Sequence, residues 1–487
     1  MIARAWNAAL VAATIAWPSV VAGQIPSTEF AARRDSLAAH VRDGVVVGFG
    51  GRTPVSDFGA FHQLPAFHYL TNFDEPDAAM VMIVRGGRAA TTLFLTPIEP
   101  RSAFYNGRRP DSAAAVRTMG VNARSFSALR GVVDSLATTG LPFYALGDHE
   151  GSDFVAEDSL TRGGQFMRSL VERHPSLTMR DAHAIVDQLR ARKSAAEIAL
   201  LKKAAEISSE GHRAAMTMAE PTKEYEIQAA LEYAFMRLGG ARPSYGSIVG
   251  GGVHGTQLHY MRDRGDVGPG DVVVMDAATE YEGYAADVTR TIPVSGTYTP
   301  AQRDIYQLVL DAQLAAERNS KPGMLASAAQ DSSIEIRARG LAKLGLIESV
   351  DAQIDMPWAT NCTQSPRSCR ESMLWTIHGI SHGLGLEVHD PAQFYTGDRR
   401  YKEGDAFTIE PGIYISTSAL DALPDTPRNR RFIANVKAAV LKYENTGVRI
   451  EDDYIITANG LERISTAPRE MAEIEALMRT RPPRIVP

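Results

Sequence analysis

The sequence predicts an α+β protein in which a smaller α/β domain precedes a larger domain of antiparallel strands and packed helices. Two observations lead to this fold class. From residue 28 to residue 188, short apolar runs alternate with helical stretches, which is the pattern of an α/β domain. From residue 189 to residue 475, well-capped helices separate strand segments that are close enough in the chain to pair antiparallel. A length of 487 residues accommodates two large domains.

Four apolar runs are the strands expected in the first domain. They are GVVVGF (44–49), AAMVMIV (78–84), TTLFL (91–95) and LPFYAL (141–146). The segment ERHPSLTMRD (172–181) and the charged run after it carry turn and charge signals, which indicate the exit from this domain. The boundary is therefore expected near residue 188.

Capping signals mark the helices of the second domain. Ser194 with Glu197 and Thr299 with Gln302 have the spacing of capping boxes, and each pair precedes apolar residues at helical spacing. Another helix is expected to begin at Thr222 and to stop at the glycines 239–240.

Strand candidates lie between and after these helices. DVVVMDA (271–277) and YAADVTRTIPV (284–294) are separated by only a short turn segment, so they are expected to form an antiparallel hairpin. DAFTIE (405–410) and GVRIEDDYIIT (447–457) are two further strands. The second domain is thus expected to combine an antiparallel sheet with helices packed against it.

Composition excludes several classes of protein. Hydrophobic residues are 44% of the chain and charged residues 22%, which is typical of a globular protein and not of a collagen-like, coiled-coil or disordered one. The net charge is −6 and the chain has no long basic run, so we expect no nucleic-acid partner.

The N-terminus has the pattern of a secretory signal. Arg4 precedes an apolar stretch of 14 residues (8–21), and the small residues Ala22 and Gly23 follow it. This stretch is shorter than the roughly 20 residues that span a bilayer, so no membrane span is expected. Residues 1–23 are predicted to be a signal peptide and the protein to be secreted or periplasmic.

The two cysteines agree with export. Cys362 and Cys369 enclose the short segment TQSPRS, which would close as a compact loop in an oxidising compartment. We expect them to form a disulfide; two unpaired thiols are the alternative.

Acidic residues interrupt apolar strand segments at four places: Asp276 after VVVM, Asp287 in AAD, Glu410 after FTI, and Glu451 after VRI. Buried carboxylates are unfavourable unless they are paired or bind a metal. Any one of them alone is better interpreted as a strand end that points to solvent, but four together favour a common site.

A histidine-rich segment completes this pattern. HGISHGLGLEVHD (378–390) places His378, His382 and His389 among glycines that allow the backbone to approach a ligand closely. Four carboxylates and one imidazole fit two divalent cations better than one, because a single zinc takes about four ligands with nitrogen or sulfur prominent. Two such cations would hold a hydroxide and stabilise a tetrahedral intermediate, which is the chemistry of hydrolysis.

The order of these motifs resembles the metallopeptidases of the "pita-bread" fold. DAATEYEGYAADVTRT (276–291), the histidine segment, TIEPGIYI (408–415) and GVRIEDDYIIT follow each other as they do in the aminopeptidase P and prolidase branch of family M24. In the first domain, FAARRDSLAAHV (30–41), YLTNFDEPDAAMVMI (69–83) and NGRR (106–109) resemble the accessory domain of the same branch more loosely. The resemblance implies a pita-bread catalytic domain over residues 189–475.

The resemblance also implies the role of each site residue. Asp276 would bind one metal, Asp287 and Glu451 would bridge both, and His382 with Glu410 would complete the other. Glu410 would in addition act as general base, and His389 would polarise the scissile carbonyl. His259 and His378 would line the pocket for the proline side of the bond, and Tyr245 and Arg449 would hold Asp276 in place. Mn²⁺ is the expected metal, with Zn²⁺ or Co²⁺ as alternatives.

The expected reaction is removal of the first residue from peptides that carry proline second. An Xaa-Pro bond is a tertiary amide with no N–H, and a metal site can polarise its carbonyl without that group. A homo-oligomer, as a dimer or a tetramer, is a further expectation. Two segments depart from the aminopeptidase P pattern. Asp57, as partner of the substrate's amine, aligns only with a one-residue shift, and the 40 residues between Glu410 and Glu451 are nearer in length to prolidase.

Several alternatives therefore stay open. Within the same class these are an Xaa-Pro dipeptidase (prolidase) and a carboxypeptidase. A metal-free, creatinase-like hydrolase and an inactive binding protein with this fold are more remote, since all five ligand positions are retained.

Overall fold

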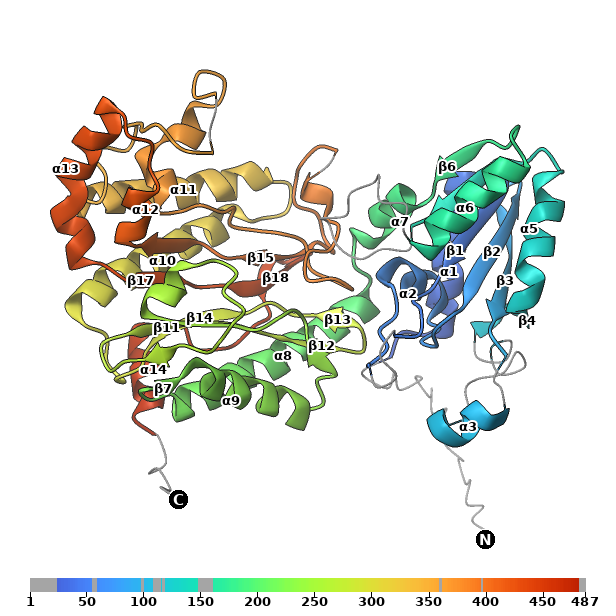
Figure 1. Cartoon of the computed structure of the whole chain (residues 1–487), viewed down its shortest axis with the longest axis horizontal. Coiled ribbons are helices and arrows are strands. Elements are labelled where there is room, and N and C mark those ends of the chain that lie inside the picture. Colours follow the sequence, from blue (N-terminus) through green and yellow to red (C-terminus); the bar gives the residue numbers. More distant parts are fainter. Residues whose placement is uncertain are drawn as a thin grey trace, which may run out of the picture.

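The computed structural model describes residues 24–54, 59–97, 100–107, 115, 119–147, 161–358, 361–395 and 397–480. Figure 1 shows two domains side by side, with the smaller one built from the first part of the chain. No helix in the described residues has both the length and the apolar character that crossing a membrane requires. The predicted signal peptide, Asp57 and the two arginines of NGRR lie outside the described residues.

A mixed six-stranded sheet forms the centre of the N-terminal domain, in the order β4-β3-β2-β1-β5-β6. The strands are β1 (Gly44–Phe49), β2 (Ala79–Arg85), β3 (Arg88–Leu95), β4 (Asn122–Ser125), β5 (Phe143–Leu146) and β6 (Met179–Asp181). β1 pairs antiparallel with β2 and parallel with β5. The four strands predicted from apolar runs are thus confirmed.

Helices cover both faces of this sheet, because side chains along β1 point alternately to either side. Val46 packs on the side of α1 (Ser27–Val41), α2 (Pro65–Thr71) and α7 (His183–Arg190). Val45 and Val47 pack on the side of α5 (Leu129–Ala137) and α6 (Arg162–Arg173). The short elements α3 (Pro100–Asn106) and η1 (Phe126–Ala128) complete the domain. The boundary expected near residue 188 falls within α7, whose contacts with α1 and α2 keep this helix with the N-terminal domain as far as Arg190.

The C-terminal domain places its strands between two pairs of long helices (Figure 1). The helices are α8 (Ala195–Met218), α9 (Glu224–Arg237), α10 (Pro300–Asn319), α11 (Ala326–Lys343), α12 (Thr417–Asp421), α13 (Pro427–Lys442) and α14 (Met471–Met478). Both predicted capping boxes are present, at the starts of α8 and α10. The helix expected at Thr222 starts two residues later, because Thr222 and Lys223 form β7 and pair with β10 (Asp266–Val267).

Short antiparallel ladders make up the strand layer of this domain. They comprise β8 (Arg242–Pro243), β9 (Ile248–Gly251), β11 (Val272–Asp276), β12 (Thr279–Tyr281), β13 (Tyr284–Ala285), β14 (Thr289–Pro293), β15 (Ala406–Ile409), β16 (Gly412–Ile415), β17 (Thr446–Arg449), β18 (Asp452–Thr457) and β19 (Gly460–Arg463). Single turns of 3₁₀ helix connect some of them: η2 (Gly252–Thr256), η3 (Pro366–Cys369), η4 (Glu371–Leu374) and η5 (Gln393–Tyr395).

Two strand predictions need refinement. The expected hairpin exists, since β11 and β14 pair antiparallel, but a second small ladder of β12 and β13 extends it. The single strand expected over 447–457 is divided in two: β17 pairs with β16, whereas β18 pairs with β15. The division falls at Ile450 and Glu451, where the chain leaves one ladder to join another.

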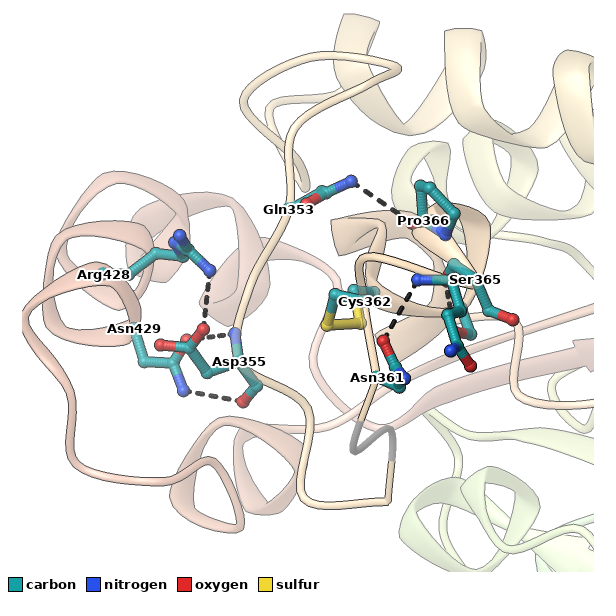
Figure 2. The surroundings of a disulfide bond; sticks show 11 residues. Gln353, Asp355, Asn361, Cys362, Ser365, Pro366, Arg428 and Asn429 are labelled. Atoms are coloured by element: carbon teal, nitrogen blue, oxygen red, sulfur yellow. Dashed lines mark hydrogen bonds and ion pairs between the residues drawn. A yellow bond between two sulfur atoms is a disulfide. The ribbon is translucent and has the colours of Figure 1, made fainter.

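The predicted disulfide between Cys362 and Cys369 is present, with the two Cα atoms 5.6 Å apart (Figure 2). The buried Cys369 accepts a hydrogen bond from the Ile354 N–H through its carbonyl oxygen. Asp355, one residue further on, exchanges main-chain hydrogen bonds with the Asn429 side chain and forms an ion pair with Arg428. The disulfide loop is thereby linked, through the segment 353–355, to α13.

Candidate metal centre and active site

Strand register brings three of the predicted acids together. Asp276, the last residue of β11, is opposite Thr289, the first residue of β14. Thr289 in turn forms a bridge with Glu451 at the break between β17 and β18, and its hydroxyl donates to Glu451 Oε2 at 2.6 Å. Asp287 lies two residues before Thr289. The three carboxylates are therefore close together at the break between β17 and β18.

Glu410 and His382 approach the same point from a neighbouring ladder. Glu410 directly follows β15, and its N–H donates to the carbonyl of Ile380 at 2.8 Å. The histidine segment runs alongside β15, where the N–H of Thr408 donates to the carbonyl of His382 at 3.0 Å. Main-chain hydrogen bonds thus fix the imidazole beside the carboxylates.

All ten residues predicted for the site line one cavity of about 470 Å³. They are Tyr245, His259, Asp276, Asp287, His378, His382, His389, Glu410, Arg449 and Glu451. Ile248, Leu258, Met261 and Val388 add apolar surface to its wall. A proline ring would find apolar contacts beside a polar reaction centre here.

The arrangement of donor atoms fits a divalent cation. One ligand atom each of Asp287, His382 and Glu451 lies within 4.8 Å of the other two. His382 Nε2 is 3.3 Å from Asp287 Oδ2 and 3.6 Å from Glu410 Oε1. Among the described residues, Glu451 Oε1 is buried without a hydrogen-bond donor. A buried carboxylate oxygen without a donor, beside other anionic oxygens, is stabilised by a cation.

The pKa values of the clustered side chains also indicate a site for cations. Burial and the charge of Glu451 raise the pKa of Glu410 to about 8, and the same causes raise the pKa of Asp287 well above its usual value. Burial alone would lower the pKa of His382, but its contacts with Asp287 and Glu451 raise it well above the ordinary value. Without metal, the cluster therefore holds protons that cations would displace.

Tyr245 and Arg449 contact Asp276 from two sides. The Tyr245 hydroxyl lies 2.5 Å from Asp276 Oδ1 and 2.5 Å from Asp287 Oδ1, so it contacts two carboxylates rather than the single one expected. The Arg449 guanidinium donates to Asp276 Oδ2 and is itself buried. These contacts orient Asp276 while its oxygens retain lone pairs for a metal.

Sequence reasoning missed Tyr414, which connects Arg449 to His378. Arg449 Nη1 donates to the Tyr414 hydroxyl oxygen at 2.8 Å, and that oxygen lies 2.8 Å from His378 Nε2. Burial and the nearby Arg449 charge lower the pKa of His378 to about 3, so its ring is neutral. The Tyr414 proton therefore points to Nε2, and the Nδ1–H faces Glu410 Oε2 at 3.4 Å. The only sequence signal was a hydroxyl-bearing side chain within the apolar strand GIYI.

Two further residues of the site also escaped sequence reasoning. Asp453 accepts the Asp287 N–H at 3.2 Å through its buried carboxylate, and burial raises its pKa well above the usual value. Thr289 contacts Glu451 as described above. Asp453 is two residues after Glu451, and Thr289 is two residues after Asp287. The available sequence signal was therefore that each lies close to a predicted metal ligand.

A second cavity, of about 660 Å³, lies between the two domains. Phe30, His62 and His68 contribute to it from the N-terminal domain, and Arg242 and Glu280 from the C-terminal domain. Val388 and His389 line both cavities, so the second cavity adjoins the first at this wall. If a peptide bond were held in the first cavity, the part of the peptide on one side of that bond would have room in the cavity between the domains.

Two divalent cations at this site would supply an activated water and would polarise a carbonyl group. Buried carboxylates and one histidine are ligands that suit such ions, and cations would remove the charge repulsion among the acids. The site defined by the fold is therefore that of a metal-dependent hydrolase.

Comparison with known proteins gives the family. Residues 199–458 match metallopeptidase family M24, and residues 30–140 match the N-terminal domain of aminopeptidase P. The chain belongs to metallopeptidase family M24. The predicted relationship to the aminopeptidase P and prolidase branch is thereby confirmed, and so is the predicted two-domain fold.

Relatives within the family narrow the class further. The chain is 31% identical over 466 residues to the Xaa-Pro aminopeptidase of Escherichia coli K12, which covers 93% of this chain and 98% of that protein. The Xaa-Pro aminopeptidase of Haemophilus influenzae is 33% identical over 424 residues, covering 86% of this chain and 88% of that protein.

Solved structures show the same two-domain architecture. A zinc-substituted aminopeptidase P from E. coli in complex with product superposes with a TM-score of 0.78 at 31% identity, covering 95% of this chain and 100% of that chain. Proline aminopeptidase P II from Yersinia pestis gives 0.77 at 29% identity, covering 93% and 100%. The chain is thus a metallopeptidase of the Xaa-Pro aminopeptidase type.

Proposed function

We propose that this protein is an exported aminopeptidase that holds two divalent cations and hydrolyses the N-terminal Xaa-Pro bond of peptides. The observation that carries the proposal is the cavity in which four carboxylates, three of them buried, meet His382, with three further histidines in its wall. The relatives named Xaa-Pro aminopeptidase support the substrate class.

Two cations rather than one are proposed because the cluster contains four carboxylates. One oxygen each of Asp287 and Glu451 lies 3.3 and 3.7 Å from His382 Nε2, and these two carboxylates would bridge the two ions. Asp276 would complete one ion and Glu410 the other. Mn²⁺ is the proposed metal because oxygen donors dominate, with Zn²⁺ or Co²⁺ as alternatives.

Each remaining side chain has a place in the reaction. Glu410 would accept a proton from the attacking water as general base. His389 would donate a hydrogen bond to the carbonyl oxygen as negative charge develops there. His259 and His378 would contact the proline side, and the neutral His378 ring is held by Tyr414.

Hydrolysis of paired peptides tests this function. Metal-loaded protein is offered an Xaa-Pro dipeptide, an Xaa-Pro-Xaa tripeptide and the matched tripeptide with alanine in place of proline. The proposal predicts rapid release of the first residue from the proline tripeptide alone or from both proline peptides, with the alanine peptide untouched. Cleavage of the dipeptide alone would replace the proposal by a prolidase, and release of the last residue would replace it by a carboxypeptidase.

Export is the remaining part of the proposal. It rests on the signal-like sequence of residues 1–23 and agrees with the disulfide, which persists in oxidising compartments. N-terminal sequencing of protein purified from its native host tests it. A start near Gly23 or Gln24 is expected, and an intact Met1 on cytosolic protein would contradict export.

A further inference from the structure

A buried ion cluster joins the N-terminal domain to the segment that carries His389. Arg190 is the last residue of α7, and its Nη2 lies 2.5 Å from both Glu387 Oε2 and Asp390 Oδ1. Lys193 Nζ lies 2.9 Å from Asp390 Oδ2. The side chains of Arg190, Lys193 and Asp390 are only 1–2% exposed. The positively charged side chains of Arg190 and Lys193 thus both contact the carboxylate of Asp390, the residue directly after His389.

The partners of this cluster belong to different domains. α7 packs against α1 and α2, and the Tyr69 hydroxyl of α2 donates to the carbonyl of Leu189 at 3.2 Å. Lys193 is already bound to the C-terminal domain, because its N–H donates to the carbonyl of Gly404 at 2.9 Å. Arg190 therefore transmits the position of α7 to Asp390.

Asp390 also closes the loop that bears two of the four histidines of the metal cavity, His382 and His389. Its N–H donates to the carbonyl of Gly383 at 3.0 Å, and its Oδ1 accepts the Glu387 N–H at 3.1 Å. His382 directly precedes Gly383, and His389 directly precedes Asp390. The two imidazole rings consequently stand side by side, with centroids 4.2 Å apart.

Glycine is required where this loop folds back on itself. A Cβ atom on Gly383 would collide with the Asp390 carbonyl, and one on Gly385 would collide with the Asp390 carboxylate and the Lys193 side chain. The two glycines thus leave room for the Asp390 carboxylate to contact both Arg190 and Lys193. The wall between the two cavities, formed by Val388 and His389, is held at its end by this contact.

We propose that Arg190 and Lys193 are positioning residues that act through Asp390 to set the location of His389. The N-terminal domain then does more than cover the cleft, because its last helix fixes a side chain that contacts the reacting carbonyl. This inference rests on the role of His389 in the proposed function. A displacement of about 1 Å at such a group can cost on the order of 100-fold in rate.

A double-mutant cycle separates positioning from general stability. Arg190→Lys keeps the charge but cannot reach both carboxylates from one planar group, and Lys193→Met removes the second cation. Lys202→Met is the matched control, since Lys202 lies on α8 in a half-exposed pair with Glu462. Each substitution is made with His389 present and in a His389→Ala background, and kcat, KM, metal content and Tm are measured.

With His389 present, Arg190→Lys and Lys193→Met are expected to lower kcat about 10-fold or more at unchanged metal content. In the His389→Ala background the same changes should lower kcat less than about 2-fold, because the group they position is gone. Lys202→Met should have no effect in either background. Equal losses in both backgrounds would overturn the proposal.

Crystal structures of Arg190→Lys and Lys193→Met provide a readout that needs no activity. The His389 ring should move by about 1 Å or more while His382 and the four carboxylates stay in place. An unmoved His389 ring in a folded variant would overturn the positioning role. If the wild-type protein cleaves no Xaa-Pro peptide, the proposed function fails, and these structures still decide whether Arg190 and Lys193 position His389.

Discussion

The Tyr245 hydroxyl contacts two of the predicted metal ligands at once. It lies 2.5 Å from oxygens of both Asp276 and Asp287, and one hydroxyl proton cannot serve two carboxylates at once. The pair therefore needs additional positive charge, which a cation would supply. Tyr245 then orients two ligands.

Tyr245→Phe should weaken metal binding about 10- to 100-fold, because it removes the contact that orients Asp276 and Asp287. Metal affinity is measured by titration of chelated protein with Mn²⁺. Tyr306→Phe is the matched control, since its buried hydroxyl donates to the Arg469 carbonyl oxygen outside the cavity. Unchanged affinity in Tyr245→Phe would show that the hydroxyl does not hold the ligands.

His389→Ala should lower kcat by at least about 100-fold while metal content stays the same, because the variant loses one stabiliser of the developing oxyanion and no metal ligand. Elemental analysis and steady-state kinetics on an Xaa-Pro-Xaa peptide check the two parts. Loss of metal in this variant would assign His389 to the metal centre instead.

The residues that sequence could identify are those whose chemistry conflicts with their surroundings. Asp276, Asp287, Glu410 and Glu451 were found because acids within apolar strands need an explanation. Tyr414 was not found, because a tyrosine in GIYI is equally compatible with ordinary packing. Its role depends on the approach of Arg449 and His378, which come from segments that are distant in sequence.

At the level of elements, the break between β17 and β18 is the feature on which the site depends. The sequence GVRIEDDYIIT has no glycine or proline after its first residue, so a single strand was expected. The two halves pair with different partners, β16 and β15, and strand pairing between distant segments leaves no local signal. Capping boxes were predicted correctly for the opposite reason, since both partners lie within one helical turn.

The disulfide is an element whose removal should affect stability but not catalysis. Cys362→Ser with Cys369→Ser should lower the free energy of unfolding by at most about 2.5 kcal/mol, the chain-entropy value for so short a loop. Neither cysteine lines the metal cavity, so kcat should not change. Denaturant unfolding with parallel kinetics checks both. A large loss of kcat at full metal content would contradict a purely stabilising role.

For the whole molecule, the domain order and fold class were predictable, whereas the contact between the domains was not. Arg190 and Asp390 are 200 residues apart and come from different domains, so neither periodicity nor a local motif relates them. The residues that line the cavity between the domains have no local sequence signal for the same reason. Composition and motifs describe each domain, but their junction is a property of the folded chain.

The stability of the metal-free protein should fall as pH rises from about 6.5 to 8, above the range in which the neutral, buried His378 makes stability rise with pH. The folded state raises the pKa of Glu410 from 4.5 to about 8 and also raises those of Asp287 and His382. These groups bind protons more tightly when folded, so the loss of their protons on raising the pH costs stability, up to about 1.4 kcal/mol per pH unit for each group. Bound Mn²⁺ should reduce this loss. Thermal unfolding across pH with and without metal measures it, and a metal-free Tm that rises over this range would contradict the assignment.

The most direct test of the account follows metal loading and reaction together. Chelated protein is titrated with Mn²⁺ while release of the first residue from an Xaa-Pro-Xaa peptide is recorded. The account predicts no turnover without metal, a plateau at about two ions per chain, and loss of both ions in Asp287→Ala, because this carboxylate would serve each ion. Full turnover in exhaustively chelated protein would contradict it and favour a metal-free hydrolase.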